Sequence, residues 1–384
     1  MRRTLVIVAA VELAALLLVP APANPDKPGI TGGIRTAAAQ LRGEGPPIDL
    51  VQDYVGARRL VGGGEAYPRL SRAFASVGID WSANHRSTHP PTAFVLVLPV
   101  AWLSWKAAAA VWAALMLGAI AGAWWALGAR AEVAVALAPL TLVWPPAAWS
   151  LGQLTPLWLL GLALAWRFRD RDASAGAAIA LASLTKLFPA LSLAPFLATG
   201  RGRVLRGFAA VWGAALAILL VLRPDVLGRY VAVARAVTRD QADRRENSAL
   251  VWAAAHNAGI AGIVAALVLV GIVLGLSLRR LSDLGRFDRW SWDAWSWAGV
   301  ALLPIAWIYS LLPLLPIVVR SLSQGGLVVR GLSLVSFVIP FLVDPFGLPG
   351  GLRLALATAC VGLALAGLAA TRPFPQRFQP RLGR

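Results

Sequence analysis

The stretch VLRGFAAVWGAALAILLVL, residues 204–222, decides the fold of this chain. It carries a single charged residue, Arg206, and it has the length that a helix needs to cross a bilayer, about 20 residues. Similar apolar runs recur along the whole sequence, whereas strand-length alternation of apolar and polar residues does not. Because a backbone in lipid must satisfy its own polar groups, these runs predict membrane helices and not a barrel.

The composition leads to the same class. The chain has 384 residues, of which 58% are hydrophobic and 14% are charged, whereas soluble domains carry roughly 25% charged residues. The mean hydropathy is +0.68. We expect a single-domain, all-α polytopic membrane protein with about 10–12 membrane helices. The candidate spans lie near 92–104, 107–127, 131–149, 154–166, 174–198, 204–222, 249–278, 291–319, 327–345 and 350–370.

The candidate spans divide the chain into four parts. Residues 1–23 form a first membrane helix, 24–90 a long polar loop, 91–370 the membrane bundle and 371–384 a tail. The N-terminal segment has a basic start, an apolar centre and an end that resembles a signal peptidase site. A retained helix is favoured over a cleaved signal peptide, and both place the next loop outside the cell.

The formal charge of +18 raises the possibility of nucleic-acid binding. The arginines, however, lie mostly in short loops between apolar runs, where positive charge marks the cytoplasmic side. We therefore expect no nucleic-acid partner, and we place 167–172, 201–203, 279–289 and the tail in the cytoplasm. The turns near 153, 186 and 307–309 then lie outside, together with an amphipathic helix in 223–248 on the outer membrane surface. The segments 174–198 and 291–319 are each predicted to be two short helices, which turn near Lys186 and Pro189 and near 304–310. Two full crossings between 92 and 127 would contradict this topology, so 92–104 is expected to be re-entrant or interfacial.

Neither cysteine nor histidine supports a metal or another cofactor. The single cysteine, Cys360, lies inside an apolar run, which excludes a disulfide framework and a thiolate site. His85 and His89 stand four residues apart, as in half of a metal site, but Pro90 and Pro91 break any helix there. We expect no bound metal and no cofactor.

A polar stretch, IDLVQDYVGARRLVGGGEAYP (48–68), interrupts the apolar pattern in the long loop. Asp49 with Gln52 three residues later forms a capping-box pattern, and Gly62–Gly64 end the predicted helix over 50–61. In one interpretation Asp49 only caps this helix, and Asp53 only lies on its wet side. Arg58 and Arg59, farther along the helix, are candidates to bind an anionic leaving group.

In the other interpretation the two carboxylates are catalytic. Residues four apart share a helix face, about 5–6 Å from each other. Joint ionisation is then unfavourable, which raises the pKa of one carboxylate and makes it a better general base. The helix dipole favours the charged form of Asp49, so electrostatics alone make Asp53 the stronger base.

Other polar residues stand at the edges of apolar runs. Lys186 is one of three lysines and lies in an apolar stretch, where an ionisable group is a functional candidate; the alternative is a lysine that reaches the interface. Three further polar residues are candidates for substrate binding: Gln153, His89 and Asn247. Alternatively, each is a buried polar group whose hydrogen bonds are satisfied within the protein. The predicted topology brings all of them to one face.

The stretch DLVQDYVGARRLVGGGEAY (49–67) resembles the first-loop motif of the bacterial polyprenyl-phosphate-mannose-dependent mannosyltransferases, glycosyltransferase family 87 of the GT-C superfamily. The residues in register are Asp49, Tyr54, Ala57, Arg58, Leu60, Gly63 and Tyr67. HPPTAFVLVLPVAWL (89–103) is similar to a Tyr-Pro-Pro motif with a proline-containing helix, and WSLGQLTPLWLLGLALAWRF (149–168) to a Gly-Gln segment. AGAAIALASLTKLFPAL (175–191), ENSAL (246–250) and LPIAWIYSLLPLLP (303–316) resemble the Lys-x-x-Pro, Asn-x-Ser and Pro-x-x-Trp-x-His elements.

The resemblance covers most of residues 48–313 and implies a GT-C-type bundle in the plasma membrane with an extracytoplasmic active site. It implies transfer of a sugar, with mannose expected, from a polyprenyl-phosphate donor to a lipid or glycan acceptor, with inversion. Asp49 would be the general base, and Lys186 or Arg58 would stabilise the leaving phosphate. The catalytic candidates are Asp49 and Asp53, and the substrate-binding candidates are Tyr54, Arg58, His89, Gln153, Lys186, Asn247, Trp307 and Tyr309.

Three positions depart from the family pattern. His89 stands in the place of a tyrosine, Tyr309 in the place of a histidine, and Asp53 in a place that is often aromatic. They leave the donor sugar, the acceptor and the linkage open. The alternative function is a lipid or polysaccharide transporter, which should show inverted repeats and ionisable residues near the midplane. A membrane scaffold with an ordinary capped loop is a third interpretation.

Overall fold

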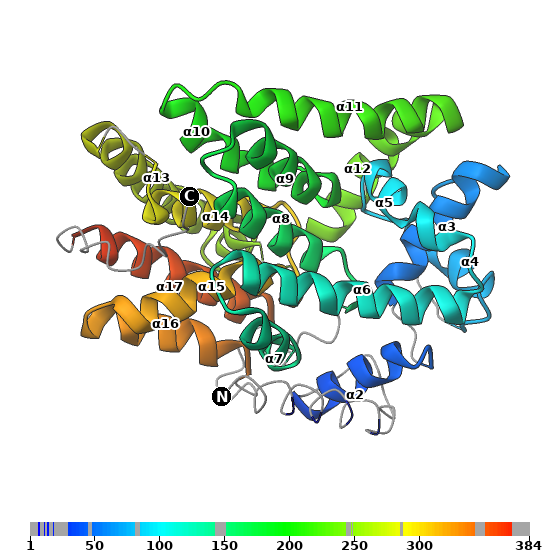
Figure 1. The fold of residues 1–384 in the computed structure, drawn as a ribbon, viewed down its shortest axis with the longest axis horizontal. Coiled ribbons are helices and arrows are strands. Elements are labelled where there is room, and N and C mark those ends of the chain that lie inside the picture. Colours follow the sequence, from blue (N-terminus) through cyan, green and yellow to red (C-terminus); the bar gives the residue numbers. More distant parts are fainter. Residues whose placement is uncertain are drawn as a thin grey trace.

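The fold was obtained as a computed structural model (Figure 1), which describes residues 30–44, 48–80, 85–142, 151–242, 247, 249–284, 287–341 and 350–370, and four isolated positions before residue 19. In these ranges all the regular elements are helices, and the nearest approach to a strand is one isolated bridge between Arg69 and Arg86. The predicted all-α polytopic fold is confirmed. Apart from those four positions, the predicted first membrane helix lies outside the described residues, as does the tail.

Four helices in the described ranges are long and apolar enough to cross a membrane: α6 (Trp105–Ala126), α11 (Val204–Leu222), α13 (Leu250–Leu284) and α17 (Gly350–Ala370). Half or less of each apolar window is buried, so these helices present apolar side chains outward, as a lipid-facing helix does. The total of 10–12 membrane helices stays a prediction. Shorter apolar helices are α5 (Pro91–Ala101), α7 (Ala131–Thr141) and α16 (Leu327–Val338), which is followed by η4 (Ile339–Phe341).

Small residues let the central helices approach closely. α9 (Asp172–Thr185) packs against both α8 (Thr155–Arg167) and α11. A Cβ atom at Gly176 would overlap the carbonyl oxygen of Val204, and one at Gly207 would overlap that of Ala173. Glycine at both positions is what allows the α9 and α11 backbones to touch, which is the usual device of helix packing in lipid.

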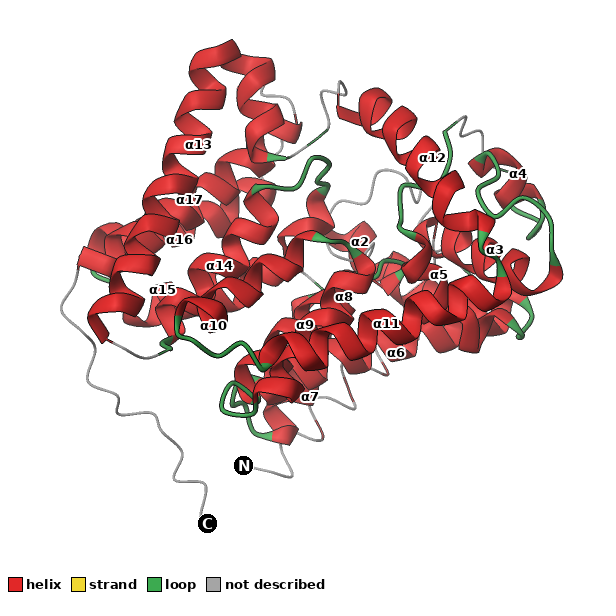
Figure 2. Ribbon diagram, turned by 90° about the horizontal axis from the view of Figure 1, so that it is seen from above, coloured by secondary structure: helices red, strands yellow, loops and turns green. Residues whose placement is uncertain are grey.

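Two hydrophobic cores meet at these central helices. The first core contains α2 (Ile30–Leu41), α3 (Ile48–Gly62), α4 (Leu70–Ala75), α5, α6, α7 and the junction of α11 with α12 (Asp225–Ala242). The second contains α8, α9, α10 (Ala194–Ala198), α13, α14 (Arg289–Ala301), α15 (Leu315–Gln324), α16 and α17. Figures 1 and 2 both show α3, α4 and α5 on one side of the molecule and α13, α16 and α17 on the other.

Two apolar segments are broken helices, as predicted. After α9 the backbone of Lys186 is extended, with φ −156° and ψ 140°, and η2 (Phe188–Leu193) follows with Pro189 in its first turn. After α14 the chain leaves the helix, and η3 (Ile308–Leu314) leads into α15. The predicted turns near Lys186 and near 304–310 are therefore confirmed.

The loop helices follow the sequence signals with two corrections. α3 ends at Gly62, and Gly63 and Gly64 adopt positive φ angles of 81° and 96°, as the glycine run predicted. Asp49 lies inside the first turn of α3, so its interpretation as the cap residue is wrong. α12 forms as predicted, but Val226 is buried in the first core and Tyr230 packs against it. Protein, and not lipid, thus covers the apolar side of its first half.

Candidate active site

Asp49 lies where four separate segments of the chain meet. Its carboxylate accepts a long hydrogen bond from Nε2 of Gln52, at 3.4 Å. The side chains of His89, Gln153 and Lys186 all interact electrostatically with it. The fold thereby brings together residues from α3, from the start of α5, from the turn before α8 and from the break after α9, as the sequence predicted.

Asp53 faces His89 directly. The Nδ1 atom of His89 lies 2.9 Å from Oδ1 and 2.8 Å from Oδ2 of Asp53. Asp53 is 1% exposed and His89 4%, so this pair is shielded from solvent, whereas Asp49 is only half-buried. Of the two carboxylates, Asp49 is therefore the one that a substrate can reach.

Two hydrogen bonds hold the backbone of His89 in position. The hydroxyl of Tyr67 donates to the His89 carbonyl oxygen at 3.1 Å, and the His89 N–H donates to Oγ of Ser87 at 3.2 Å. One turn later, the hydroxyl of Thr92 donates to the carbonyl oxygen of Leu184 at 2.8 Å. This last bond ties the start of α5 to the end of α9, two residues before Lys186.

The side of the site opposite α3 is formed by Lys186, Gln153 and Tyr309. The Nζ atom of Lys186 lies over the ring of Tyr309, 5.5 Å from its centroid. Gln153 is 1% exposed and interacts with both Asp49 and Tyr309, yet its Nε2 makes no hydrogen bond of ordinary geometry within the described ranges. A buried amide donor of this kind is costly unless a ligand completes it.

Asn247 is a positioning residue in this arrangement. It is 2% exposed, its Nδ2 donates to the carbonyl oxygen of Pro304 at 3.0 Å, and its Oδ1 accepts from the N–H groups of Ala306 at 3.0 Å and Ala249 at 3.1 Å. These bonds fasten the loop before η3 to the start of α13. The half-buried Trp307 belongs to the same loop, where its N–H donates to Oγ of Ser310 at 3.2 Å.

Tyr54 and Arg58 lie away from this group. The hydroxyl of the fully buried Tyr54 donates to the Leu103 carbonyl oxygen at 2.7 Å, which fastens α3 to the end of α5. The exposed Arg58 donates to that hydroxyl at 3.2 Å and lies over the Tyr54 ring. Within the described residues neither side chain contacts Asp49 or Lys186, so the structure does not bring Arg58 to the predicted leaving group.

Burial and charge act against each other on the two carboxylates. Burial is the largest influence and raises the pKa of Asp49 above its ordinary value of 3.8, while His89, Gln153 and Lys186 lower it. Burial likewise raises the pKa of Asp53, and His89 opposes this through its charge and its hydrogen bond. A carboxylate with a raised pKa is a better proton acceptor near neutral pH.

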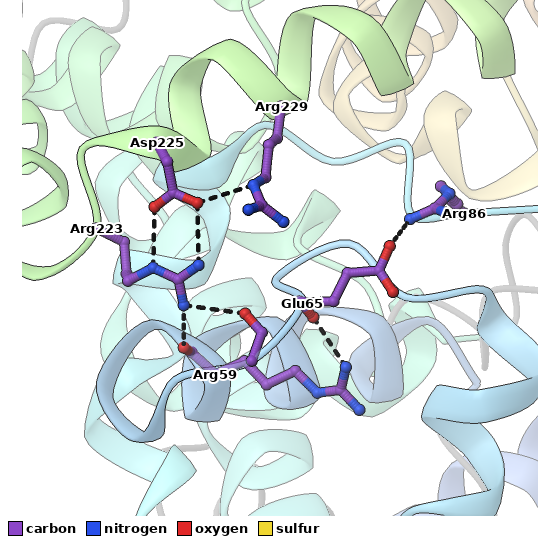
Figure 3. Close-up of polar contacts among 7 residues, drawn as sticks. Arg59, Glu65, Arg86, Arg223, Asp225 and Arg229 are labelled. Carbon is purple, nitrogen blue, oxygen red and sulfur yellow. Dashed lines mark hydrogen bonds and ion pairs between the residues drawn. The ribbon is translucent and has the colours of Figure 1, made fainter.

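An arginine at the α11–α12 junction anchors the far end of α3 (Figure 3). Arg223 uses one guanidinium nitrogen to donate to the carbonyl oxygens of Arg59 and Gly64, at 3.2 and 3.0 Å. Its other two nitrogens donate to the carboxylate of Asp225, at 2.9 and 3.0 Å. A forked Arg–carboxylate pair has fixed geometry, so Arg223 holds the C-terminal end of the helix that carries Asp49 and Asp53.

Sequence reasoning did not identify three of these positioning residues as parts of the site. Tyr67 was recognised only as the end of the first-loop motif, and Thr92 and Arg223 carried no signal. Thr92 is a small polar residue in an apolar run, and Arg223 is one arginine among many. Their partners lie 92 and 159–164 residues away, so only the tertiary fold reveals these contacts.

The fold and the site define a helical membrane protein in which acidic side chains from a loop helix meet a lysine at the end of an interior helix. Residues 88–303, more than half of the chain, match the sequence model of glycosyltransferase family 87. The chain belongs to this family and is a membrane glycosyltransferase. The match begins one residue before His89 and includes Gln153, Lys186 and Asn247, whereas Asp49 and Asp53 precede it. No curated protein and no solved structure matches the chain.

Proposed function

We propose that this enzyme transfers a sugar, with mannose as the expected one, from a polyprenyl-phosphate donor to a hydroxyl of a lipid or glycan acceptor. The reaction takes place at the extracytoplasmic side of the plasma membrane and inverts the anomeric centre. The observation that carries the proposal is the meeting of a half-buried carboxylate, Asp49, with a half-buried ammonium group, Lys186, at the junction of two cores.

Asp49 is the general base. The acceptor oxygen attacks the anomeric carbon, its proton passes to the Asp49 carboxylate, and the bond from carbon to the phosphate oxygen breaks. Access favours Asp49 over Asp53 for this role, because Asp53 is fully buried with both oxygens against His89. The raised pKa of Asp49 supports the same role, since base strength grows with pKa.

Lys186 stabilises the leaving group. When the carbon–oxygen bond breaks, the polyprenyl phosphate gains one negative charge. A cation fixed beside the phosphate in a site of low dielectric stabilises that charge without reorganisation. Lys186 suits this role because it lies outside regular helix, at the break after α9, and is packed over the Tyr309 ring. The buried amide of Gln153, which interacts with both Asp49 and Tyr309, is suited to bind a sugar hydroxyl or a phosphate oxygen.

A lipid or polysaccharide transporter is the second candidate, because the protein is polytopic and its site holds ionisable groups. The family membership and the gathering of those groups at a single site both favour the enzyme. A transporter would move its lipid without consuming a labelled sugar donor, so the two functions give opposite results in one assay.

The test uses the full-length protein reconstituted in liposomes with radiolabelled polyprenyl-phosphate mannose and a lipid extract as acceptor source. We expect label to pass from donor to a new glycolipid or glycan, and this transfer to disappear in Asp49→Asn. Asp80→Asn is the matched control, since Asp80 is an exposed aspartate of the same loop region. Movement of intact donor across the bilayer with no transfer would identify a transporter instead.

A further inference from the structure

Asp53 and His89 are in direct contact with each other. The carboxylate oxygens of Asp53 lie 2.8 and 2.9 Å from Nδ1 of His89, and both side chains are buried. Neither polar side chain would be tolerated easily alone in this place, because an unpaired carboxylate or imidazole would lose its solvation. The two residues therefore form one unit.

The geometry of the pair fixes the chemistry of the ring. Both oxygens of Asp53 face Nδ1, and a carboxylate only accepts hydrogen bonds, so Nδ1 carries a proton. In the neutral ring this leaves the lone pair on Nε2. Within the described residues Nε2 has no hydrogen-bond partner, and the ring is close enough to Asp49 for the two charges to interact. Nε2 is therefore the ring atom that is available to a ligand in the site.

We propose that Asp53 is a positioning residue and not a second base: it fixes the orientation and tautomer of His89, whose Nε2 accepts a hydrogen bond from a hydroxyl of the bound substrate. The pair thus adds a second hydroxyl-binding group beside Asp49. This inference rests on the proposed sugar transfer, which supplies the substrate class: the hydroxyl-rich donor sugar or the acceptor alcohol.

The surroundings of the pair support this division of roles. The groups that interact with it are Asp49 on α3, Tyr67 before α4 and Tyr309 in η3. Asp53 is 1% exposed and both of its oxygens lie against Nδ1 of His89, whereas Asp49 and Lys186 are half-buried, so Asp53 can act on a substrate only through the His89 ring. An aspartate that acts through a histidine in this way is a recurrent device in enzymes, because it excludes the wrong tautomer.

A double-mutant cycle in the reconstituted enzyme tests the unit. We expect Asp53→Asn and His89→Gln each to lower kcat/KM by about 10- to 100-fold, inside the range of coupling between contacting residues. The double variant should lose no more than the worse single variant. The melting temperature of each variant is measured in parallel. We expect it to stay close to the wild-type value while activity falls, whereas loss of a purely structural pair would lower the melting temperature as well. Losses that multiply in the double variant would overturn the proposal.

Nuclear magnetic resonance of ¹⁵N-histidine protein in detergent micelles tests the tautomer without any sugar transfer. The chain has three histidines, and His85→Gln and His256→Gln variants assign the signal of His89. We expect protonated Nδ1, with a shift of the Nε2 signal when a short-chain polyprenyl-phosphate sugar and an acceptor alcohol are added. A proton on Nε2 in place of Nδ1, or an Nε2 signal that ignores both substrates, would refute the assignment. Wild type with the expected tautomer but no transfer would instead reject the proposed function.

Discussion

The two cores of the molecule supply the site in different ways. The first core delivers Asp49 and Asp53 from within a continuous helix, α3, which is held at its far end by Arg223. The second core delivers Lys186 and Tyr309 from places where a helix has been interrupted. An intact helix fixes the spacing of two acidic side chains. A break in a membrane helix leaves backbone polar groups unpaired, and it is tolerated where those groups are buried in protein or line a polar site. The proposed base and the proposed cation thus come from different hydrophobic cores.

The comparison predicts that loss of the acid from the first core has the largest effect on catalysis. Asp49→Asn removes the proton acceptor while it keeps the shape of the side chain. We expect kcat to fall by about 10²- to 10⁴-fold, the usual contribution of a general base. Transfer of label by the reconstituted variant measures the loss, and an active Asp49→Asn enzyme would move the base to another residue.

The second prediction removes the cation from the opposite core. Lys186→Gln keeps most of the volume but no longer supplies a charge to the leaving phosphate. We expect a fall in kcat of about 10²- to 10³-fold, as for the loss of one preorganised electrostatic donor. Lys106→Gln, at the start of α6, serves as the matched control in the first core. Equal losses in both lysine variants would contradict a specific role for Lys186.

The third prediction disturbs the seam between the cores. A Cβ atom at Gly207 would overlap the Ala173 carbonyl oxygen, so Gly207→Val should push α11 away from α9. Overpacking of this kind costs about 1–3 kcal/mol. We expect a lower melting temperature together with reduced transfer. Gly213→Val on the same helix meets open space and should leave both unchanged.

The fourth prediction concerns the anchor of α3. Arg223→Gln removes the fork to Asp225 and at least one bond to the end of the helix. Because α3 also packs into the first core, we expect a loss of activity of no more than about tenfold, near the 1.4 kcal/mol equivalent of a hydrogen bond. Arg229→Gln, which loses only its own pair with Asp225, should have a smaller effect. Identical kinetics in wild type and Arg223→Gln would show that the core alone holds α3.

The smallest expected effect is a displaced pH profile. The base must be ionised to accept a proton, and burial raises the pKa of Asp49 above its ordinary value of 3.8. Activity should therefore rise with pH through the raised pKa, so that the acidic limb of kcat/KM lies at higher pH than for an ordinary aspartate. In Lys186→Gln a neighbouring positive charge is lost, and the limb should move to still higher pH. Residual activity measured between pH 4 and 8 distinguishes these cases.

The elements that the sequence predicted well are those set by local pattern. The run at 204–222 became α11 with the same bounds, because its apolar composition depends on nothing outside itself. The breaks at Lys186 and before η3 were also predicted, since proline and polar residues mark them locally. The predicted topology placed His89, Gln153 and Lys186 on the same face as the loop that carries Asp49, and the structure brings these four residues together.

Partnerships between distant residues were beyond the sequence. Asp53 looked like the stronger base from its helix position, whereas the structure gives both of its oxygens to His89, 36 residues away. Asn247 looked like a substrate ligand, yet its amide is used by three backbone groups. Arg58 looked like a phosphate ligand, yet it lies on the Tyr54 ring. In each case the hydrogen-bond or ring partner of the side chain was decided by tertiary packing. The residues near it in the sequence do not reveal that packing.

The half-buried position of Asp49 has a consequence for hydrolysis of the donor, a side reaction. A carboxylate that an alcohol can approach is also open to water, and water is the smaller and more abundant nucleophile. When no acceptor is bound, the enzyme should slowly hydrolyse its donor and release free sugar. In the proposed reaction, a bound acceptor would protect the sugar donor from hydrolysis because it fills the space beside Asp49.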